Sequence, residues 1–240
     1  MRYFFKLSVI VLLIFTVIPL IRSAPPTYLL TEKDFLYETW FKVEAVDLMN
    51  DGASQLVALG RDYTEARISA QLLALEQGKL ISKWESPNLI NEGPVVMGVG
   101  RPLSADQPML IILSQECLYL YTYENQRITL SYQFKHSLSP HELSVADTDG
   151  DGLDELIVVR LGKRLATYDE KVVEVYRLTT EGLLKLGSSA LLGNIRCLTG
   201  GDLDGDGYAE VVTDAGCSSK PGLITVLGWD PAKQELVIKS

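Results

Sequence analysis

Two stretches of the chain place acidic side chains at alternate positions within a short, glycine-containing segment. The first runs from Asp147 to Glu155, and the second runs from Asp202 to Glu210, 55 residues further along. Each has aspartate at positions one, three and five, glycine at positions four and six, and glutamate at position nine. Carboxylates this close together repel one another unless a cation lies between them. The spacing therefore indicates a site for a metal ion that prefers oxygen ligands.

Each loop is predicted to supply five ligands, four of them carboxylates and one the backbone carbonyl at position seven. The predicted ligands are Asp147, Asp149, Asp151, the Leu153 carbonyl and Glu155 in one loop, and Asp202, Asp204, Asp206, the Tyr208 carbonyl and Glu210 in the other. Hard oxygen ligands in this number suit Ca²⁺ far better than zinc. An EF-hand is excluded, because Val158 and Thr213 occupy its twelfth position and the flanking residues favour strands.

The two loops belong to a longer repeat with a period near fifty residues. One hundred residues before Asp147, the segment 47–55 keeps Asp47, Asp51 and Gly52, but has Met49 and Gln55 at ligand positions. Whether this first loop binds calcium is left open. The segment 98–107 lies midway and has no ligand pattern. A fixed period of this length is typical of repeat architectures.

Short strand-like segments follow every loop in the same order. An apolar run comes first, then a segment rich in strand-forming residues, then a polar turn and a further strand. The apolar runs are residues 56–59, 109–113, 156–159 and 211–212. Such runs predict strands that are buried on both faces. Each unit is thus a four-stranded antiparallel sheet with its loop between the first and second strands.

An isolated sheet of this size cannot bury both of its faces, but sheets stacked radially can. The predicted fold is therefore an all-β propeller of about four four-stranded antiparallel blades. The predicted boundaries are 1–23 for a signal, 24–40 for a segment that could add a closing strand, and 41–90, 91–138, 139–192 and 193–240 for the blades. Four blades could close alone, form an open arc, or pair with a second copy as a homodimer.

The acidic loops and the apolar strands beside them resemble the FG-GAP or VCBS-type repeat, which forms blades of the integrin α-chain β-propeller. The resemblance is strong in the third and fourth units, partial in the first and limited to strand order in the second. It implies a propeller whose calcium ligands are the ten groups named above. It also implies a role in cell adhesion or in binding other molecules.

The N-terminus predicts export to a secreted or cell-surface location. Arg2 and Lys6 precede an apolar run over 7–20, and small residues follow, as in a secretory signal. An uncleaved membrane tether is the alternative. Without the three basic residues of the segment 1–23, the net charge falls from -9 to -12. An acidic surface argues against nucleic acid as a partner.

Three cysteines are too few for a disulfide framework. Cys197 and Cys217 fall on neighbouring strands and could pair, although buried free thiols are the stronger expectation.

Enzymatic chemistry has weak support in the sequence. Histidine occurs only at 136 and 141, near Ser137 and Ser139, and there is no nucleophile-elbow motif. The primary hypothesis is therefore an exported, non-enzymatic calcium-binding module that binds an extracellular protein or glycan. The alternative is a calcium-dependent enzyme acting on extracellular polysaccharide, with a carboxylate pair drawn from residues such as Asp169, Glu170 and Glu174.

Overall fold

The computed structural model describes residues 39–76, 79–164, 169–215 and 223–239. Over these residues the chain forms sixteen β-strands and no helix, so the predicted all-β class is confirmed. No helix within this range is long and apolar enough to cross a membrane. The predicted signal, residues 24–38 of the possible closing strand, and Cys217 lie outside the described residues.

The strands fall into four successive groups of four. The first group is β1 (Thr39–Val46), β2 (Gln55–Asp62), β3 (Arg67–Glu76) and β4 (Lys79–Glu85). The second is β5 (Val96–Gly100), β6 (Met109–Leu113), β7 (Cys117–Glu124) and β8 (Arg127–Lys135). The third is β9 (Pro140–Ala146), β10 (Glu155–Arg164), β11 (Asp169–Thr179) and β12 (Gly182–Ser189). The fourth is β13 (Leu198–Gly201), β14 (Glu210–Ala215), β15 (Leu223–Asp230) and β16 (Glu235–Ile238). We call these groups units one to four.

Within every unit the strands pair antiparallel in chain order, as the sequence predicts. Units one and two are separate four-stranded sheets, whereas units three and four form one eight-stranded sheet. A short parallel pairing of β12 with β16, at Ser188 with Glu235 and Ser189 with Leu236, joins them. Gly187 permits this approach, because a side chain there would overlap with the backbone carbonyl of Gln234. The strands are thus arranged in sheets of four, four and eight rather than in four separate blades.

Hydrophobic cores lie between successive units. The second strands supply much of each core, and β6 is buried along its whole length. One core joins Val57 and Leu72 of unit one to Leu110 and Ile112 of unit two. Equivalent cores lie between units two and three and between units three and four. Each sheet therefore buries a face against its neighbour, which one four-stranded sheet could not do alone.

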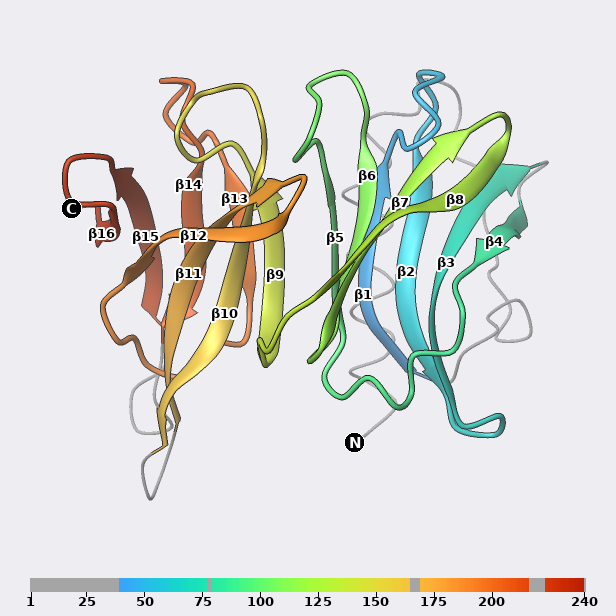
Figure 1. Ribbon diagram of the computed structural model, residues 1–240, viewed down its shortest axis with the longest axis horizontal. Coiled ribbons are helices and arrows are strands. Elements are labelled where there is room, and N and C mark those ends of the chain that lie inside the picture. Colours follow the sequence, from blue (N-terminus) through green and yellow to red (C-terminus); the bar gives the residue numbers. More distant parts are fainter. Residues whose placement is uncertain (1–38, 77–78, 165–168, 216–222, 240) are drawn as a thin grey trace.

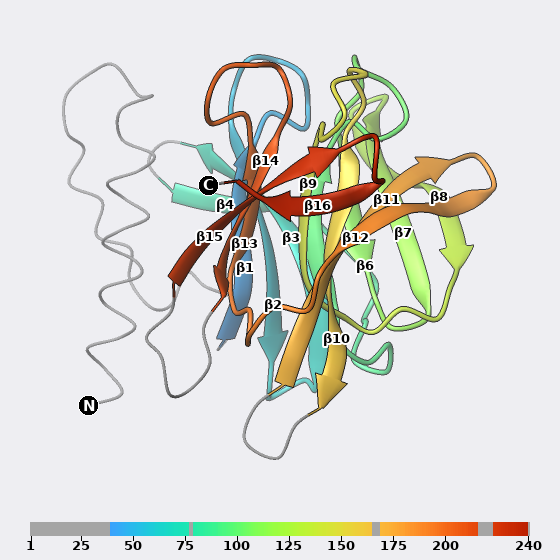
Figure 2. The same ribbon diagram turned by 90° about the vertical axis from the view of Figure 1, so that its left-hand side faces the viewer.

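The first strands of the units lie next to one another across the middle of the molecule (Figure 1). β1 contacts β5, β5 contacts β9, and β9 contacts β13. Lys42 of β1 also reaches β9, where its Nζ donates a hydrogen bond of 2.5 Å to the carbonyl of Leu143. In Figures 1 and 2 the loops that join first to second strands lie at one common end of the molecule. The fold therefore places the acidic loops along one edge.

Glycine permits the close approach of these inner strands. A Cβ atom at Gly98 of β5 would lie 2.7 Å from Val145 of β9, and one at Gly200 of β13 would lie 2.8 Å from the Cβ of Ala146. Gly200 also donates its backbone N–H to the Ser144 hydroxyl at 2.9 Å. A side chain at Gly200 would therefore push units three and four apart.

We predict that Gly200→Ala destabilises the protein by about 1–3 kcal/mol, the usual cost of overpacking a tight contact. Gly201→Ala is the matched control, because nothing lies within 4 Å of a Cβ at that neighbouring position of the same strand. Urea unfolding of the two variants measures the difference. Equal unfolding midpoints would show that the inner strands are not packed as closely as described.

Candidate metal centre

An aspartate at the start of the third-unit loop folds the backbone around its own carboxylate. Asp147 Oδ1 accepts the N–H of Gly150 at 2.7 Å, and its Oδ2 accepts the N–H of Gly152 at 2.8 Å. Both glycines have positive φ angles, 74° and 88°, which residues with a Cβ adopt at a cost. Asp151 Oδ1 then accepts the N–H of Leu153 at 2.9 Å. These bonds form the tight turn that the motif predicts.

The fourth-unit loop has the same geometry. Asp202 accepts the N–H groups of Gly205 and Gly207 at 2.7 and 3.1 Å, and these glycines have φ angles of 80° and 90°. Asp206 Oδ1 accepts the N–H of Tyr208 at 2.9 Å. Two segments with the same spacing of aspartate and glycine have therefore folded in the same way.

The glutamate at position nine of each loop is the first residue of a buried strand. Glu155 opens β10 and is fully buried; its Oε2 accepts the N–H and the hydroxyl of Thr148 at 2.9 and 2.8 Å. Glu210 opens β14, and its Oε2 accepts the N–H of Leu203 at 2.9 Å. Burial raises the pKa of Glu155, while the bonds from Thr148 oppose this effect. In both loops one glutamate oxygen accepts a backbone N–H, and the other, Oε1, pairs with a basic side chain.

Three carboxylates in each loop are close enough to share one metal ion. Oxygens of Asp147, Asp149 and Glu155 lie within 4.8 Å of one another, as do those of Asp202, Asp204 and Asp206. The remaining two predicted carboxylates, Asp151 and Glu210, are outside these groups of three but near them. Ligation by the carbonyls of Leu153 and Tyr208 stays a prediction. Both clusters could hold a metal ion, and neither contains a nitrogen or sulfur ligand.

Each cluster also faces a basic side chain, which the sequence motif did not indicate. Nη2 of Arg177, on β11, pairs with Asp149, with Asp151 at 2.9 Å and with Glu155 at 3.1 Å. Nζ of Lys239, just after β16, lies 3.2 Å from Asp204, 4.0 Å from Asp206 and 2.5 Å from Glu210. The bond to Glu210 is the main reason that the pKa of Lys239 is raised. Strand register could have revealed Arg177, but nothing in the sequence points to Lys239.

The first-unit loop forms a similar turn, but a glutamine stands where the other two loops have a glutamate. Asp47 accepts the N–H groups of Asp51 and Gly52 at 3.0 and 2.8 Å. The buried Gln55 occupies position nine, and its Oε1 accepts the N–H groups of Leu48 and Met49. Its Nε2 donates to the Ala53 carbonyl at 2.5 Å and to Asp51 at 3.5 Å. An amide N–H thus lies where the other loops have a carboxylate oxygen.

Neighbouring loops are bonded to each other along this edge. Ala209 donates its N–H to the carbonyl of Asp147 at 2.7 Å, and the ring of Tyr208 packs against Gly150. The second-unit loop joins the row through Arg101, whose N–H bonds to Asp154 Oδ2 at 2.5 Å. The two acidic loops are therefore in direct contact.

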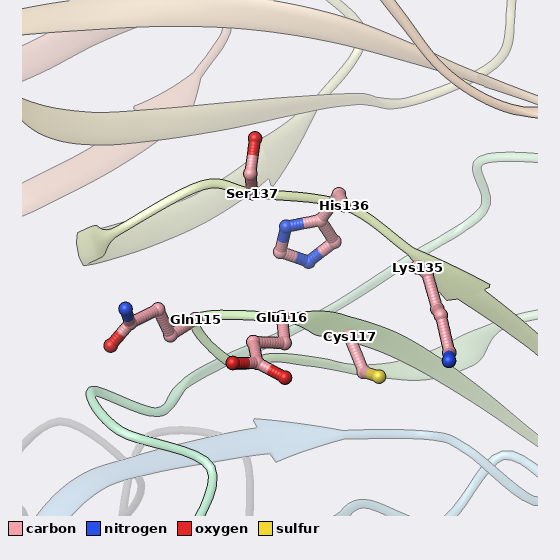
Figure 3. A pocket seen from close by; sticks show the side chains of 6 residues that line it. All are labelled: Gln115, Glu116, Cys117, Lys135, His136 and Ser137. Carbon is pink, nitrogen blue, oxygen red and sulfur yellow. The ribbon is translucent and has the colours of Figure 1, made fainter.

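The histidine at 136 does not form a catalytic pair with its neighbouring serine. His136 and Ser137 border a cavity of about 300 Å³ with Cys117, and Figure 3 shows the Ser137 hydroxyl pointing away from the imidazole. The ring Nδ1 accepts the N–H of Leu138 at 3.0 Å, and burial lowers the pKa of His136. The other histidine, His141, is part of β9. This geometry does not activate Ser137 as a nucleophile.

Glu174, a carboxylate considered for glycosidase chemistry, is already fully engaged. It is buried and receives bonds from Arg160 at 2.8 Å, Lys185 at 2.6 Å and the Tyr176 hydroxyl at 2.6 Å. Burial alone would raise the pKa of Glu174, but these three donors together lower it. An ionised and fully paired carboxylate is poorly suited to donate a proton to a leaving group.

The thiols differ from expectation at one position. Cys117 is buried, as expected of a free thiol, whereas Cys197 is exposed. Cys197 precedes β13, and its backbone N–H donates to Asp214 Oδ1 at 2.8 Å.

Comparison with known families identifies the acidic segment. Residues 147–213 match the model of the FG-GAP-like repeat, a span that begins at Asp147 and includes both acidic loops. The resemblance inferred from the sequence is confirmed by this match. A comparison with curated proteins gave no match.

We predict that Gln55→Glu destabilises the metal-free protein by about 1–3 kcal/mol. The substitution places a buried carboxylate oxygen, instead of the Nε2 donor, against Asp51 and the Ala53 carbonyl, so a buried charge faces two acceptors and no donor. Gln126→Glu makes the same chemical change at an exposed turn position and is the control. Chemical unfolding in the presence of a chelator compares the two. Equal stabilities would contradict a structural role for the Gln55 amide.

Proposed function

We propose that this chain, whose residues 147–213 match the FG-GAP-like repeat, is an exported calcium-binding module of the β-propeller type that binds another protein. One observation carries the calcium assignment: two loops with the same backbone geometry each bring three carboxylates within 4.8 Å of one another. Export rests on the predicted N-terminal signal. Tethering through an uncleaved N-terminus and pairing of two copies are further predictions from the sequence.

The ligand set favours calcium over other common ions. Every side-chain ligand in the two clusters is a carboxylate, and hard oxygen ligands suit calcium or magnesium rather than zinc or copper. Magnesium requires near-ideal octahedral geometry and usually keeps several waters. Loops with four carboxylates and a carbonyl within nine residues fit the larger and more flexible coordination of calcium. We expect dissociation constants of about 10⁻⁴ to 10⁻³ M, as in other extracellular modules.

The bound ion would serve mainly to brace the loops. Each loop turns the chain from an inner strand into a buried strand, and its carboxylates repel one another without a cation. Glu155 and Glu210 connect the sites to the cores, because they are the buried first residues of β10 and β14. Calcium would therefore stabilise the entry of these strands into the core.

A propeller arrangement is supported by the way the units are stacked. Four antiparallel units follow in order, their first strands contact one another in succession, and a hydrophobic core lies between each pair of neighbours. The bond from Lys42 to the Leu143 carbonyl links the first and third units through the interior. The parallel pairing of β12 with β16 departs from a simple propeller, because it joins the outer strands of two units.

A cleft between units one and two offers a surface for a protein partner. It has a volume of about 630 Å³, and its lining includes Trp84, Tyr123, Lys83 and Arg127. Aromatic residues and arginine are enriched where protein partners bind most strongly. The edge of Trp84 is held against Tyr121 at a centroid distance of 4.9 Å, so the platform is preformed. We place the partner at this cleft.

Calcium removal tests the metal assignment. At about 100 times Kd, calcium is expected to add about 2.7 kcal/mol for each occupied site, because it binds the folded state alone. Thermal melting with calcium and with chelator should therefore differ, and calorimetry should show two sites. Asp149→Asn and Asp204→Asn should each remove one site. Magnesium at equal ionic strength is the control, and a melting temperature unaffected by chelator would exclude structural calcium.

The immobilised protein tests the binding role. We expect it to retain a protein from an extracellular fraction in calcium, and Arg127→Glu to reduce this retention several-fold. Lys233→Glu makes the same charge reversal at an exposed turn away from the cleft and should leave retention unchanged. Retention that survives protease treatment of the fraction would point to a glycan instead. Equal retention by both variants would place the partner elsewhere.

A further inference from the structure

Strand register shows that the three acidic loops obtain their central N–H donor from three different sources. The residue after position nine pairs with the third strand of its unit: Leu56 with Leu73, Leu156 with Tyr176 and Val211 with Leu227. One residue further along that third strand lies beside position nine. It is Ala74 in unit one, Arg177 in unit three and Gly228 in unit four. The corresponding position thus carries a cation in one unit alone.

In unit four Lys239, which directly follows β16, lies over Gly228, the position that corresponds to Arg177 in unit three. A Cβ atom at Gly228 would lie 2.6 Å from Cε and 3.2 Å from Cγ of Lys239. The aliphatic part of Lys239 therefore crosses directly over Gly228, and its Nζ then reaches Glu210 and Asp204. The backbone of Lys239 is held in this position by a 2.9 Å hydrogen bond from its N–H to the Val226 carbonyl.

In unit one, where Ala74 offers no cation, the loop supplies its own donor through Gln55 Nε2. The first loop also has fewer charges to balance, since Met49 replaces the aspartate at position three. Its donor is a buried neutral amide, whereas Arg177 and Lys239 are partly exposed, with 32% and 40% of their side-chain surface accessible. The two cations therefore have solvent into which they can move, and Gln55 does not.

Resting on the proposed calcium function, we propose that Arg177 and Lys239 are exchangeable counter-cations, which neutralise the metal-free loops and are displaced when calcium binds. Each forms ion pairs with three of the predicted ligands. Arg177 pairs with Asp149, Asp151 and Glu155, and Lys239 pairs with Asp204, Asp206 and Glu210. A divalent ion among the same oxygens would lie within a few ångströms of the basic nitrogen and repel it. The two occupants exclude each other.

Two consequences follow from this exchange. Without calcium, the third-unit and fourth-unit loops keep their turns, because the basic side chain replaces part of the missing positive charge. With calcium, affinity is lower than the ligands alone would give, because each ion must first break existing ion pairs. Removing the basic side chain should therefore lower the stability of the metal-free protein and raise its affinity for calcium.

Lys239→Gln in an Asp149→Asn background tests the exchange at loop four alone, since the background removes loop three as a calcium site. We expect calcium to bind the Lys239→Gln protein about fivefold more tightly by calorimetry, corresponding to about 1 kcal/mol. The same variant should melt at a lower temperature in chelator. Lys233→Gln in the same background is the control for a lost lysine, because Lys233 pairs with Asp230 in the β15–β16 turn.

The outcomes separate this inference from the proposed function. Calcium binding that is equal or weaker in the Lys239→Gln protein overturns the exchange and leaves the calcium site intact. Absence of binding in both proteins overturns the calcium function, and the exchange with it. Lys239→Arg keeps the charge and should bind calcium close to the parent affinity. If Lys239→Arg instead behaves like Lys239→Gln, the effect comes from packing over Gly228, and the exchange is overturned.

Discussion

The hydrogen bonds from backbone N–H groups to the first aspartate of each acidic loop are the interactions on which the site depends. Asp47 and Asp147 each accept two such bonds, and Asp202 accepts three, from residues three to five positions later. The bonds turn the chain sharply enough for the next strand to run back beside the previous one. They also point the remaining acidic side chains towards a common centre. The same bonds thus form the strand connection and assemble the charged cluster.

Clustering of negative charge is the cost of this arrangement, and the protein offsets it in different ways. In unit one the cluster has fewer carboxylates and contains an amide donor. In units three and four a basic side chain from elsewhere in the same unit, Arg177 or Lys239, lies among the carboxylates. The loops touch through Ala209 and Asp147, so charge at one site acts on the next over a short distance. Electrostatic balance along this edge is consequently a property of the row of loops as a whole.

The features that are encoded locally could be predicted from the sequence. The aspartate and glycine spacing predicted both turns, and the apolar runs predicted the buried strands β2, β6, β10 and β14. The all-β class and the fourfold grouping of strands also follow from the repeated apolar runs and turns. Contacts between residues that are distant in the sequence could not be predicted in this way. The β12–β16 pairing requires the approach of Gln234 to Gly187, and Lys239 reaches Glu210 only because Gly228 has no side chain. Such contacts depend on three-dimensional packing, which no motif spacing records.

The amide of Gln55 has a consequence for how such repeats can change over evolutionary time. Glutamine and glutamate differ by one base in the genetic code and have nearly the same shape. In unit one Gln55 bonds the same two features of the loop as Glu155 does in unit three: a backbone N–H near position two on one side and the loop centre on the other. A repeat can therefore exchange a charged ligand for an internal donor without altering its strand connection.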